Sequence, residues 1–400
     1  MTSEHLAVHA ITALTSMLAL GWLWQAVAAL RGIPTVPDLT HPDAALLDLG
    51  ASEGPDVTVV VPACNEEQSI EATLRSLLAS TGVRLQIVAV DDRSTDRTGE
   101  RMDAVVAQAL SGPHTLEIIH NRELPLGWIG KPHALALGAE RARAPWLLFT
   151  DGDMKFHPRA LALGLGYAAR ERADHVVLMF TLELESIAEG AVFAALQALT
   201  AWNMRLWKVA DPEARDFFGA GGFNLVRRAV YESLGGFAAL RMDVVEDLRL
   251  GWKIKRTGYA QRIVLGPGLA RIRWIDGALS IVGLMEKNGF AGLRYRAGLA
   301  LLAFFGFAVQ IVLPLAAIAC GGWAALAGLL VYVFIALTYA AYRPVTQVSP
   351  WVAAFFAPAT AILLFAIARS MALTIKRDGV EWRGTHYPLD ELRRNAGDWR

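Results

Sequence analysis

The chain contains few cysteines and carries no net charge. Cys64 and Cys320 are its two cysteines, and they lie in very different local sequences, so a disulfide framework is excluded and a reducing compartment is indicated. The nine histidines are scattered and lack the Cys/His spacing of a zinc site. A formal net charge of zero argues against a nucleic-acid partner, because binding to phosphates requires a basic surface.

Charged residues are also scarce. They make up 19% of the chain, against about 25% in a typical soluble domain, so part of the chain is expected to lie in lipid. The start of the chain, MTSEH, has no basic cluster and no cleavage site follows Arg31, which favours an uncleaved anchor over a signal peptide.

Four apolar runs are long enough to cross a hydrocarbon core of about 30 Å: 9–30, Leu299–Cys320, Trp323–Tyr342 and Trp351–Leu373. We predict a transmembrane anchor over residues 1–31 and transmembrane helices over residues 299–373.

Two features of the sequence disagree about the side of the membrane on which the C-terminal tail lies. Four spans around a cytoplasmic central segment would place both termini outside. Basic residues in the predicted tail, residues 374–400, instead favour the cytoplasm: Lys376, Arg377, Arg383, Arg393, Arg394 and Arg400. One of the three C-terminal runs is therefore a candidate for a helix that does not cross fully.

Short apolar segments alternate with amphipathic ones between residues 55 and 275. We expect strands at Val57–Pro62, Leu85–Val90, Thr115–His120, Trp146–Thr150 and His175–Phe180. A helix is expected after the first strand, and another from Thr95 to about Leu110. This alternation predicts an α/β domain with a mostly parallel sheet covered on both faces.

Polar residues follow three of these strands, at the edge where ligands bind in such sheets. Asn65 and Glu66 follow the first strand, Asp91-Asp92 ends the second, and Asp151-Gly152-Asp153 follows the fourth. Two carboxylates on one tight turn suit a hard divalent cation that takes its other ligands from phosphates. The first turn reads PACNEE and lacks the Gly-x-Gly-x-x-Gly pattern of a Rossmann dehydrogenase.

Four motifs occur in order: VVVPACNEE, VAVDDRSTD, TDGD and VVEDLRLG. They resemble those of family 2 glycosyltransferases of the GT-A fold, which is Rossmann-like. GWIGKPHAL from Gly127 and EKNGFAGL from Glu286 are similar to a membrane-bound subgroup that includes hopene-associated and carotenoid glycosyltransferases. The resemblance covers about residues 57–293 and implies a GT-A catalytic domain over residues 55–275.

The resemblance also implies roles for individual residues on the donor side. The nucleotide pocket would be lined or contacted by Pro62, Asn65, Glu67, Asp91, Asp92 and Lys131. The aspartates would accept hydrogen bonds from the base or ribose, and Lys131 would meet the nucleotide or its phosphates. The alternative for the aspartates is helix capping, shared with Ser94 and Thr95.

The metal and the general base are implied in the same way. Asp153 would hold Mn²⁺ or Mg²⁺ directly, and Asp151 would share that metal and bind the donor. Asp247, beside Glu246, would be the general base that takes the proton of the acceptor hydroxyl. The alternative for this pair is an exposed acidic turn of a helix. Glycines in the sequence GAGGFN from Gly219 are expected where a backbone closes around a sugar, or in a simple turn.

Two departures from the family pattern affect the interpretation. Cys64 stands where the family commonly has Arg or Tyr, and Ala270 takes the Gln place before Arg273-Trp274 in the processive Gln-x-x-Arg-Trp pattern. The second departure favours transfer of a single sugar. Residues 278–296 form an amphipathic segment, which predicts a helix in the membrane interface or one packed on the domain.

Together these features predict an inverting, metal-dependent glycosyltransferase in a bacterial-type inner or plasma membrane, with its catalytic domain in the cytoplasm. It would move one sugar from a nucleotide sugar, expected to be a UDP-sugar, to a hydroxyl of a membrane lipid of hopanoid, carotenoid or polyisoprenoid type. The alternatives are a processive polysaccharide synthase and a non-catalytic membrane scaffold that kept the GT-A fold.

Overall fold

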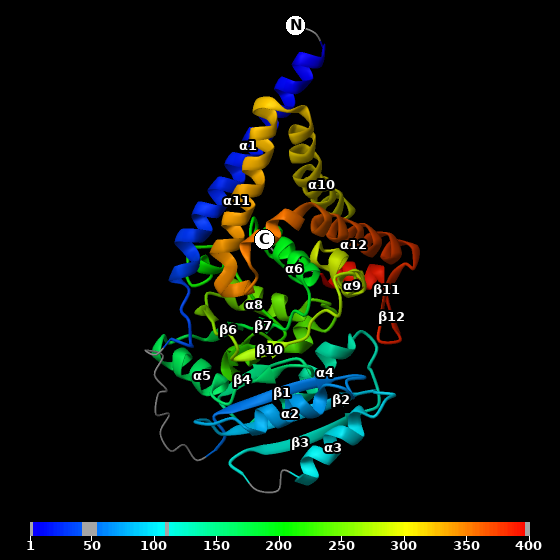
Figure 1. Ribbon diagram of the computed structural model, residues 1–400. Helices are drawn as coiled ribbons and strands as arrows, with labels where there is room; N and C mark the ends of the chain where they lie inside the picture. Colours follow the sequence, from blue (N-terminus) through cyan, green and yellow to red (C-terminus); the bar gives the residue numbers. More distant parts are fainter. Residues whose placement is uncertain (1–2, 42–53, 109–111, 397–400) are drawn as a thin grey trace. The chain divides into compact units, whose positions relative to one another are not determined.

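The computed structural model describes residues 3–41, 54–108 and 112–396 (Figure 1). The predicted helix end at Leu110 and the tail residue Arg400 lie outside the described residues. The chain forms two compact units. The helical unit comprises Met1–Thr35, Leu184–Arg205 and Trp274–Trp382, and the sheet unit comprises Val36–Glu183, Leu206–Arg273 and Arg383–Arg400.

The sheet unit is built on a sheet that has seven strands among the described residues, in the order β3-β2-β1-β4-β8-β6-β9. Four neighbouring pairs are parallel, and β8 runs antiparallel to both β4 and β6. The mostly parallel sheet that the sequence predicts is therefore confirmed. The strands are β1 (Val57–Ala63), β2 (Leu85–Asp92), β3 (Thr115–Asn121), β4 (Trp146–Phe149), β6 (His175–Met179), β8 (Asn224–Arg227) and β9 (Gln261–Leu265).

Helices and short strands complete the sheet unit. A small sheet has the order β5-β10-β7, with β5 (Lys155–Phe156), β7 (Thr181–Leu182) and β10 (Ala270–Ile272). The helices are α2 (Ile70–Leu78), α3 (Thr98–Gln108), α4 (Gly130–Glu140), α5 (Ala160–Arg170), α7 (Arg228–Ser233), α8 (Glu246–Arg256) and α13 (Leu389–Asn395), and β12 (Thr385–Pro388) precedes α13. Two 3₁₀ turns, Leu206–Lys208 and Phe237–Leu240, lie between them.

The central strands are apolar and buried along their whole length. Every residue of β1 and β2 is buried, as expected for parallel strands covered on both faces. Their register pairs Ala63 with Asp91, so the two strands end side by side. Gly138 lets α4 lie close to β1, because a Cβ at this position would overlap the Val60 side chain. This packing brings the N-terminal turn of α4 to the carboxyl edge of the sheet.

Because β8 runs antiparallel to β4, the loop that precedes β8 lies at the carboxyl edge of the sheet. Asn224 at the start of β8 pairs with Phe149 at the end of β4, so the residues before Asn224 adjoin those after Phe149. Buried His175 secures β8 from the other side, because its Nε2 lies 2.5 Å from Asn224 Oδ1. Its Nδ1 accepts a hydrogen bond of 2.8 Å from Gln261 of β9.

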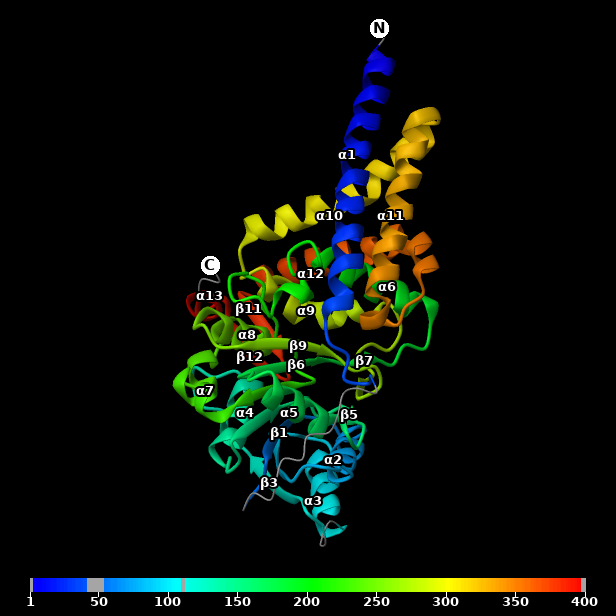
Figure 2. The same cartoon turned by 90° about the vertical axis from the view of Figure 1, so that its left-hand side faces the viewer.

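The helical unit contains four helices that, among the described residues, are long and apolar enough to cross a membrane. They are α1 (Ser3–Gly32, followed by the 3₁₀ turn Ile33–Thr35), α10 (Ala297–Cys320), α11 (Gly322–Thr346) and α12 (Phe356–Lys376, preceded by the 3₁₀ turn Pro350–Phe355). Both views show α1 beside α11, and Figure 1 shows that α12 runs at a steep angle to these two helices (Figures 1 and 2). The strand β11 (Gly379–Trp382) follows α12.

Small residues and one polar contact hold the long helices together. The residues of α1 that are buried include Ala19, Ala26 and Ala29, whose small side chains let neighbouring helices approach closely. Trp22 is fully buried and its Nε1 donates a hydrogen bond of 2.8 Å to Gln310 of α10. At Gly328 of α11 an added Cβ would lie 2.6 Å from the carbonyl oxygen of Pro314, so only glycine allows this approach.

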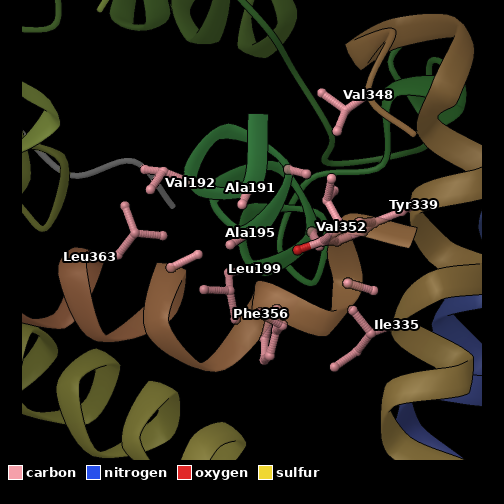
Figure 3. Close-up of a cluster of buried hydrophobic side chains, with 14 of the residues drawn as sticks. Ala191, Val192, Ala195, Leu199, Ile335, Tyr339, Val348, Val352, Phe356 and Leu363 are labelled. Carbon is pink, nitrogen blue, oxygen red and sulfur yellow. The ribbon is translucent and has the colours of Figure 1, made fainter. Parts of the chain in front are cut away.

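Two further helices, α6 (Ile187–Thr200) and α9 (Ser280–Gly292), pack within the same unit. Figure 3 shows Ala191, Val192, Ala195 and Leu199 of α6 against Phe356 of α12 and its neighbours. The predicted amphipathic segment 278–296 forms α9, which packs on α12. Glu286 of α9 bonds to Arg369 at 2.9 Å and to Arg377 at 2.7 Å, and Ser370 donates to the Glu286 carbonyl.

Candidate active site

The loops after β1 and β2 are tied to each other. Asn65 has a left-handed backbone (φ 57°), and its Oδ1 accepts a hydrogen bond of 2.8 Å from the Thr95 amide. Glu67 Oε2 accepts one of 3.1 Å from the Arg97 amide. Pro62 is buried in β1 beside Val90 of β2. The polar side chains of the first loop therefore shape the second loop.

The two aspartates that end β2 point to opposite faces, as successive strand residues do. Asp91 is 1% exposed and faces α3, where a Cβ at Gly99 would lie 2.8 Å from its Oδ2. His120 of the neighbouring strand β3 places its Nδ1 3.0 Å from the same oxygen. Asp92 faces the start of α4. It forms a two-point ion pair with Arg93, at 2.8 and 3.0 Å, and accepts a hydrogen bond of 2.7 Å from Asn121.

Lys131, in the first turn of α4, lies between two carboxylates. Its Nζ is 2.6 Å from Asp151 Oδ1, just after β4, and 2.7 Å from Glu246 Oε1 at the start of α8. Burial alone would lower the pKa of Lys131, but Asp151 and Glu246 raise it well above its usual value. The ammonium group is therefore charged and joins three elements at the carboxyl edge of the sheet.

Asp247 is held by backbone groups. Its Oδ1 accepts a hydrogen bond of 2.7 Å from the Leu248 amide, and the Gly221 amide donates to the same carboxylate. Burial raises the pKa of Asp247, while Lys131 opposes that rise. A Cβ at Gly219 would overlap the Asp247 carbonyl, and one at Gly221 would lie 2.5 Å from Asp151 Oδ2. The glycine loop, residues 219–222, therefore lies against both Asp247 and Asp151, and its Gly221 amide donates to the Asp247 carboxylate.

Asp153 has a different environment from Asp151. Burial, together with the charges of Asp151 and Glu66, raises the pKa of Asp153 to about 7. In the part of the chain that the structure describes, no ion pair links Asp153 to a basic residue, and no group of three His, Cys, Asp or Glu side chains forms a complete metal site. Two carboxylates do fit Mg²⁺ or Mn²⁺ where substrate phosphates supply further ligands.

The structure brings Lys131, Asp151, Glu246 and Asp247 together from distant parts of the chain. It leaves Asp91 on the opposite face of the sheet. Sequence reasoning missed Asn121 and Arg93 as partners of Asp92, and it missed the contact of Arg383 Nη2 with Glu66 Oε1 at 2.7 Å. Arg383 is 317 positions from Glu66, and in the sequence it is only one of several basic residues in the tail.

A parallel sheet with an acidic cluster at its carboxyl edge is the architecture of a GT-A domain. Residues 58–247, a little under half of the chain, match the family described as Glycosyl transferase family 2. The sequence expectation of a family 2 glycosyltransferase domain with the GT-A fold is confirmed.

Known proteins are similar over part or most of the chain. A dolichol-phosphate mannosyltransferase of Pyrococcus furiosus is 26% identical over 202 residues, half of each protein. A 4,4'-diaponeurosporenoate glycosyltransferase of Staphylococcus haemolyticus is 31% identical over 101 residues, 25% of each. A mannosyltransferase from Pyrobaculum calidifontis, solved with GDP-Man and Mn²⁺, has a TM-score of 0.54 and 21% identity, covering 91% of this chain and 97% of that one. The chain thus spans at most about half the length of these curated relatives.

We predict that Gly219→Ala lowers the rate of sugar transfer by roughly 100-fold, because displacing a reacting group by about 1 Å has an effect of this size. The new methyl group must push α8, and Asp247 with it, away from the glycine loop. Transfer from UDP- and GDP-sugars to lipid extract is measured alongside the melting temperature. Gly112→Ala is the control, because a Cβ there meets nothing within 4 Å. Full activity of Gly219→Ala would contradict this account of the loop.

Proposed function

We propose that the chain transfers one sugar from a nucleotide-sugar donor to a hydroxyl of a membrane lipid, with inversion at the anomeric carbon. The observation that carries the proposal is the cluster of Lys131, Asp151, Glu246 and Asp247 at the sheet edge of a family 2 domain. A UDP-sugar is the donor expected from the sequence. The GDP-Man bound to the similar mannosyltransferase makes a GDP-sugar the second candidate.

In the proposed reaction Asp247 accepts the proton of the acceptor hydroxyl. The freed oxygen forms a bond to the anomeric carbon from the face opposite the leaving group, and the bond from that carbon to the diphosphate breaks. Two backbone amides hold the Asp247 carboxylate in position, and burial raises its pKa, which makes it a stronger base. Glu246 is paired with Lys131 and therefore positions the helix that carries the base.

Asp153 and Asp151 are the residues proposed to hold a divalent cation. Such an ion would neutralise the charge that develops on the departing diphosphate. Because Lys131 already neutralises Asp151, the Asp153 carboxylate, whose neighbours are negative, is the one proposed to bind the cation directly. The positive charge of Lys131 lies close enough to this turn to stabilise a phosphate held there.

A groove in the helical unit supports an apolar acceptor. It has a volume of about 670 Å³ between α9 and α12, and its lining is mostly apolar: Leu279, Val282, Gly283, Ala361, Ile362, Phe365 and Arg369. Leu279 and Phe365 are both more than 60% exposed, which is costly in water and favourable in contact with lipid. The similar proteins named for dolichol phosphate and diaponeurosporenoate support the same class of acceptor.

The path of the chain supports a cytoplasmic tail. The chain leaves the sheet unit after Arg273 and re-enters it at Arg383, so the helices between them make an even number of crossings. Because α12 runs at a steep angle to α1 and α11, the proposed crossing pair is α10 and α11 (Figure 1). With α1 as the third span, the sheet unit and the basic tail share the cytoplasmic side, as the positive-inside rule favours.

The two alternatives receive less support. Ala270 stands where processive enzymes have Gln. It is fully buried in β10 and offers no polar group to a growing polymer. A non-catalytic scaffold would have no reason to keep Lys131 ion-paired with two acidic side chains in the interior of the site, since burying such charges is costly.

Chelation of divalent ions with EDTA should abolish transfer, and Mn²⁺ or Mg²⁺ should restore it. Asp153→Ala should be inactive with or without added metal while its melting temperature stays near that of the wild type. The readout is transfer of a radiolabelled sugar to lipid extract. Undiminished transfer in excess EDTA would exclude the proposed metal role.

Asp247→Asn should reduce kcat by a factor of about 10² to 10⁴, the usual contribution of a positioned base, with little change in donor affinity. The amide keeps the size of the side chain but cannot accept the proton. Steady-state kinetics and donor binding are compared with those of Asp103→Asn, which changes an exposed aspartate on α3. Loss of donor binding, with kcat for bound donor unchanged, would reassign Asp247 to the donor site.

Cells that produce the protein should contain one class of membrane lipid that carries a single additional hexose-sized unit. The acceptor groove is apolar and Ala270 replaces the polymer-associated Gln, so one sugar per lipid is expected. Mass spectrometry of lipids from cells with and without the protein makes the comparison. A ladder of sugar increments or a water-soluble polymer would favour the processive alternative.

A further inference from the structure

Residues 383–387, near the end of the chain, contact the loops that surround the proposed donor site. The Arg383 guanidinium lies 2.7 Å from Glu66 Oε1, and it also donates a hydrogen bond to the thiol of Cys64. Two residues later, Thr385 Oγ1 accepts a hydrogen bond of 3.3 Å from Arg93. The segment therefore contacts the loops after β1 and β2 together.

Tyr387 anchors the same segment to a third element. Its side chain is 4% exposed, and its hydroxyl accepts a hydrogen bond of 3.2 Å from the amide of Gly130 at the start of α4. Lys131 is the next residue. A buried anchor at Tyr387 and a bond at Thr385 restrict the positions that the Arg383 side chain can reach.

Arg383, although paired with Glu66, is more exposed than Lys131 and Arg93, the neighbouring cations of this site. Lys131 lies between Asp151 and Glu246, and Arg93 is paired at two points with Asp92. The Arg383 side chain is 38% exposed, so a ligand can reach it. No Lys or Arg occurs in residues 62–69, so the first loop supplies no cation of its own.

The location of Glu66 shows which part of a donor Arg383 would meet. A Cβ at Gly152 would lie 3.5 Å from the Glu66 Cγ, so Glu66 extends over the Asp151–Asp153 turn. The Arg383 guanidinium is bonded to this same Glu66 side chain, which links it to the turn through one residue. A guanidinium forms two parallel hydrogen bonds to a phosphate, which suits a diphosphate bound against the turn.

We infer that Arg383 is a donor-binding residue that contacts the diphosphate of the nucleotide sugar, and that Thr385 and Tyr387 hold it in position. This inference rests on the proposed function and adds a residue outside the matched family domain, which ends at residue 247. The C-terminal tail is then part of the donor site as well as the segment that follows the last membrane helix.

The test measures binding of UDP and of GDP, each with Mn²⁺, to the full chain in detergent by calorimetry. Arg383→Ala should weaken binding of the nucleoside diphosphate that the wild type prefers by about 10- to 100-fold, the range for hydrogen bonds to charged groups. Arg383→Lys should retain part of the affinity. Arg394→Ala is the matched control, because Arg394 is in the same tail. Among the residues that the structure describes, Arg394 pairs only with the exposed Asp390.

A swap distinguishes a contact with the ligand from a structural role. Because the Arg383 guanidinium lies against Cys64, an arginine at position 64 can place its guanidinium in nearly the same position. The double variant Cys64→Arg/Arg383→Ala should recover most of the affinity lost in Arg383→Ala. Recovery would not be expected if Arg383→Ala acted only by loosening the tail.

Equal affinity of wild type and Arg383→Ala would overturn the inference alone. So would a loss of affinity that accompanies a lower melting temperature and is not recovered by the swap. If the wild type bound neither nucleoside diphosphate and transferred no sugar, the proposed function would fall and the inference with it. Binding and transfer by the wild type therefore distinguish a failure of the inference about Arg383 from a failure of the proposed function.

Discussion

Three elements of the sheet unit meet around the ammonium group of Lys131, which lies 2.6 Å from Asp151 and 2.7 Å from Glu246. The Glu246 side chain is only 3% exposed, so its charge depends on this partner rather than on water. Leaving such a carboxylate without its cation costs about 3–5 kcal/mol. The ion pairs therefore fix where α8 begins relative to the ends of β4 and α4, and Asp247 follows directly.

Backbone packing brings the acidic groups this close. The loop before β8 must lie against α8 and against Asp151, and a side chain at Gly219 or Gly221 would fill that space. The antiparallel direction of β8 delivers the loop to the correct edge, because Asn224 pairs with the last residue of β4. The Asp247 carboxylate is thus held by backbone amides, while Asp151 and Glu246 are held by their ion pairs with Lys131. Groups fixed in this way need little rearrangement when charge develops nearby.

The membrane helices and the site are parts of one continuous path. The chain passes through α9 to α12 and then returns to the sheet unit at Arg383, next to the loops after β1 and β2. Small residues are buried along both α1 and α11, which allows these two long apolar helices to pack closely.

Much of this protein is determined by local sequence. Alternating apolar strands and polar strand ends predict the parallel sheet and the acidic edge, because strand periodicity and burial act over a few residues. Long uncharged runs predict the membrane helices for the same reason. Tertiary structure alone decided that Asp91 turns away toward His120, that Lys131 joins Asp151 to Glu246, and that Arg383 reaches Glu66. Such contacts join residues as many as 317 positions apart, and their geometry depends on how complete elements pack.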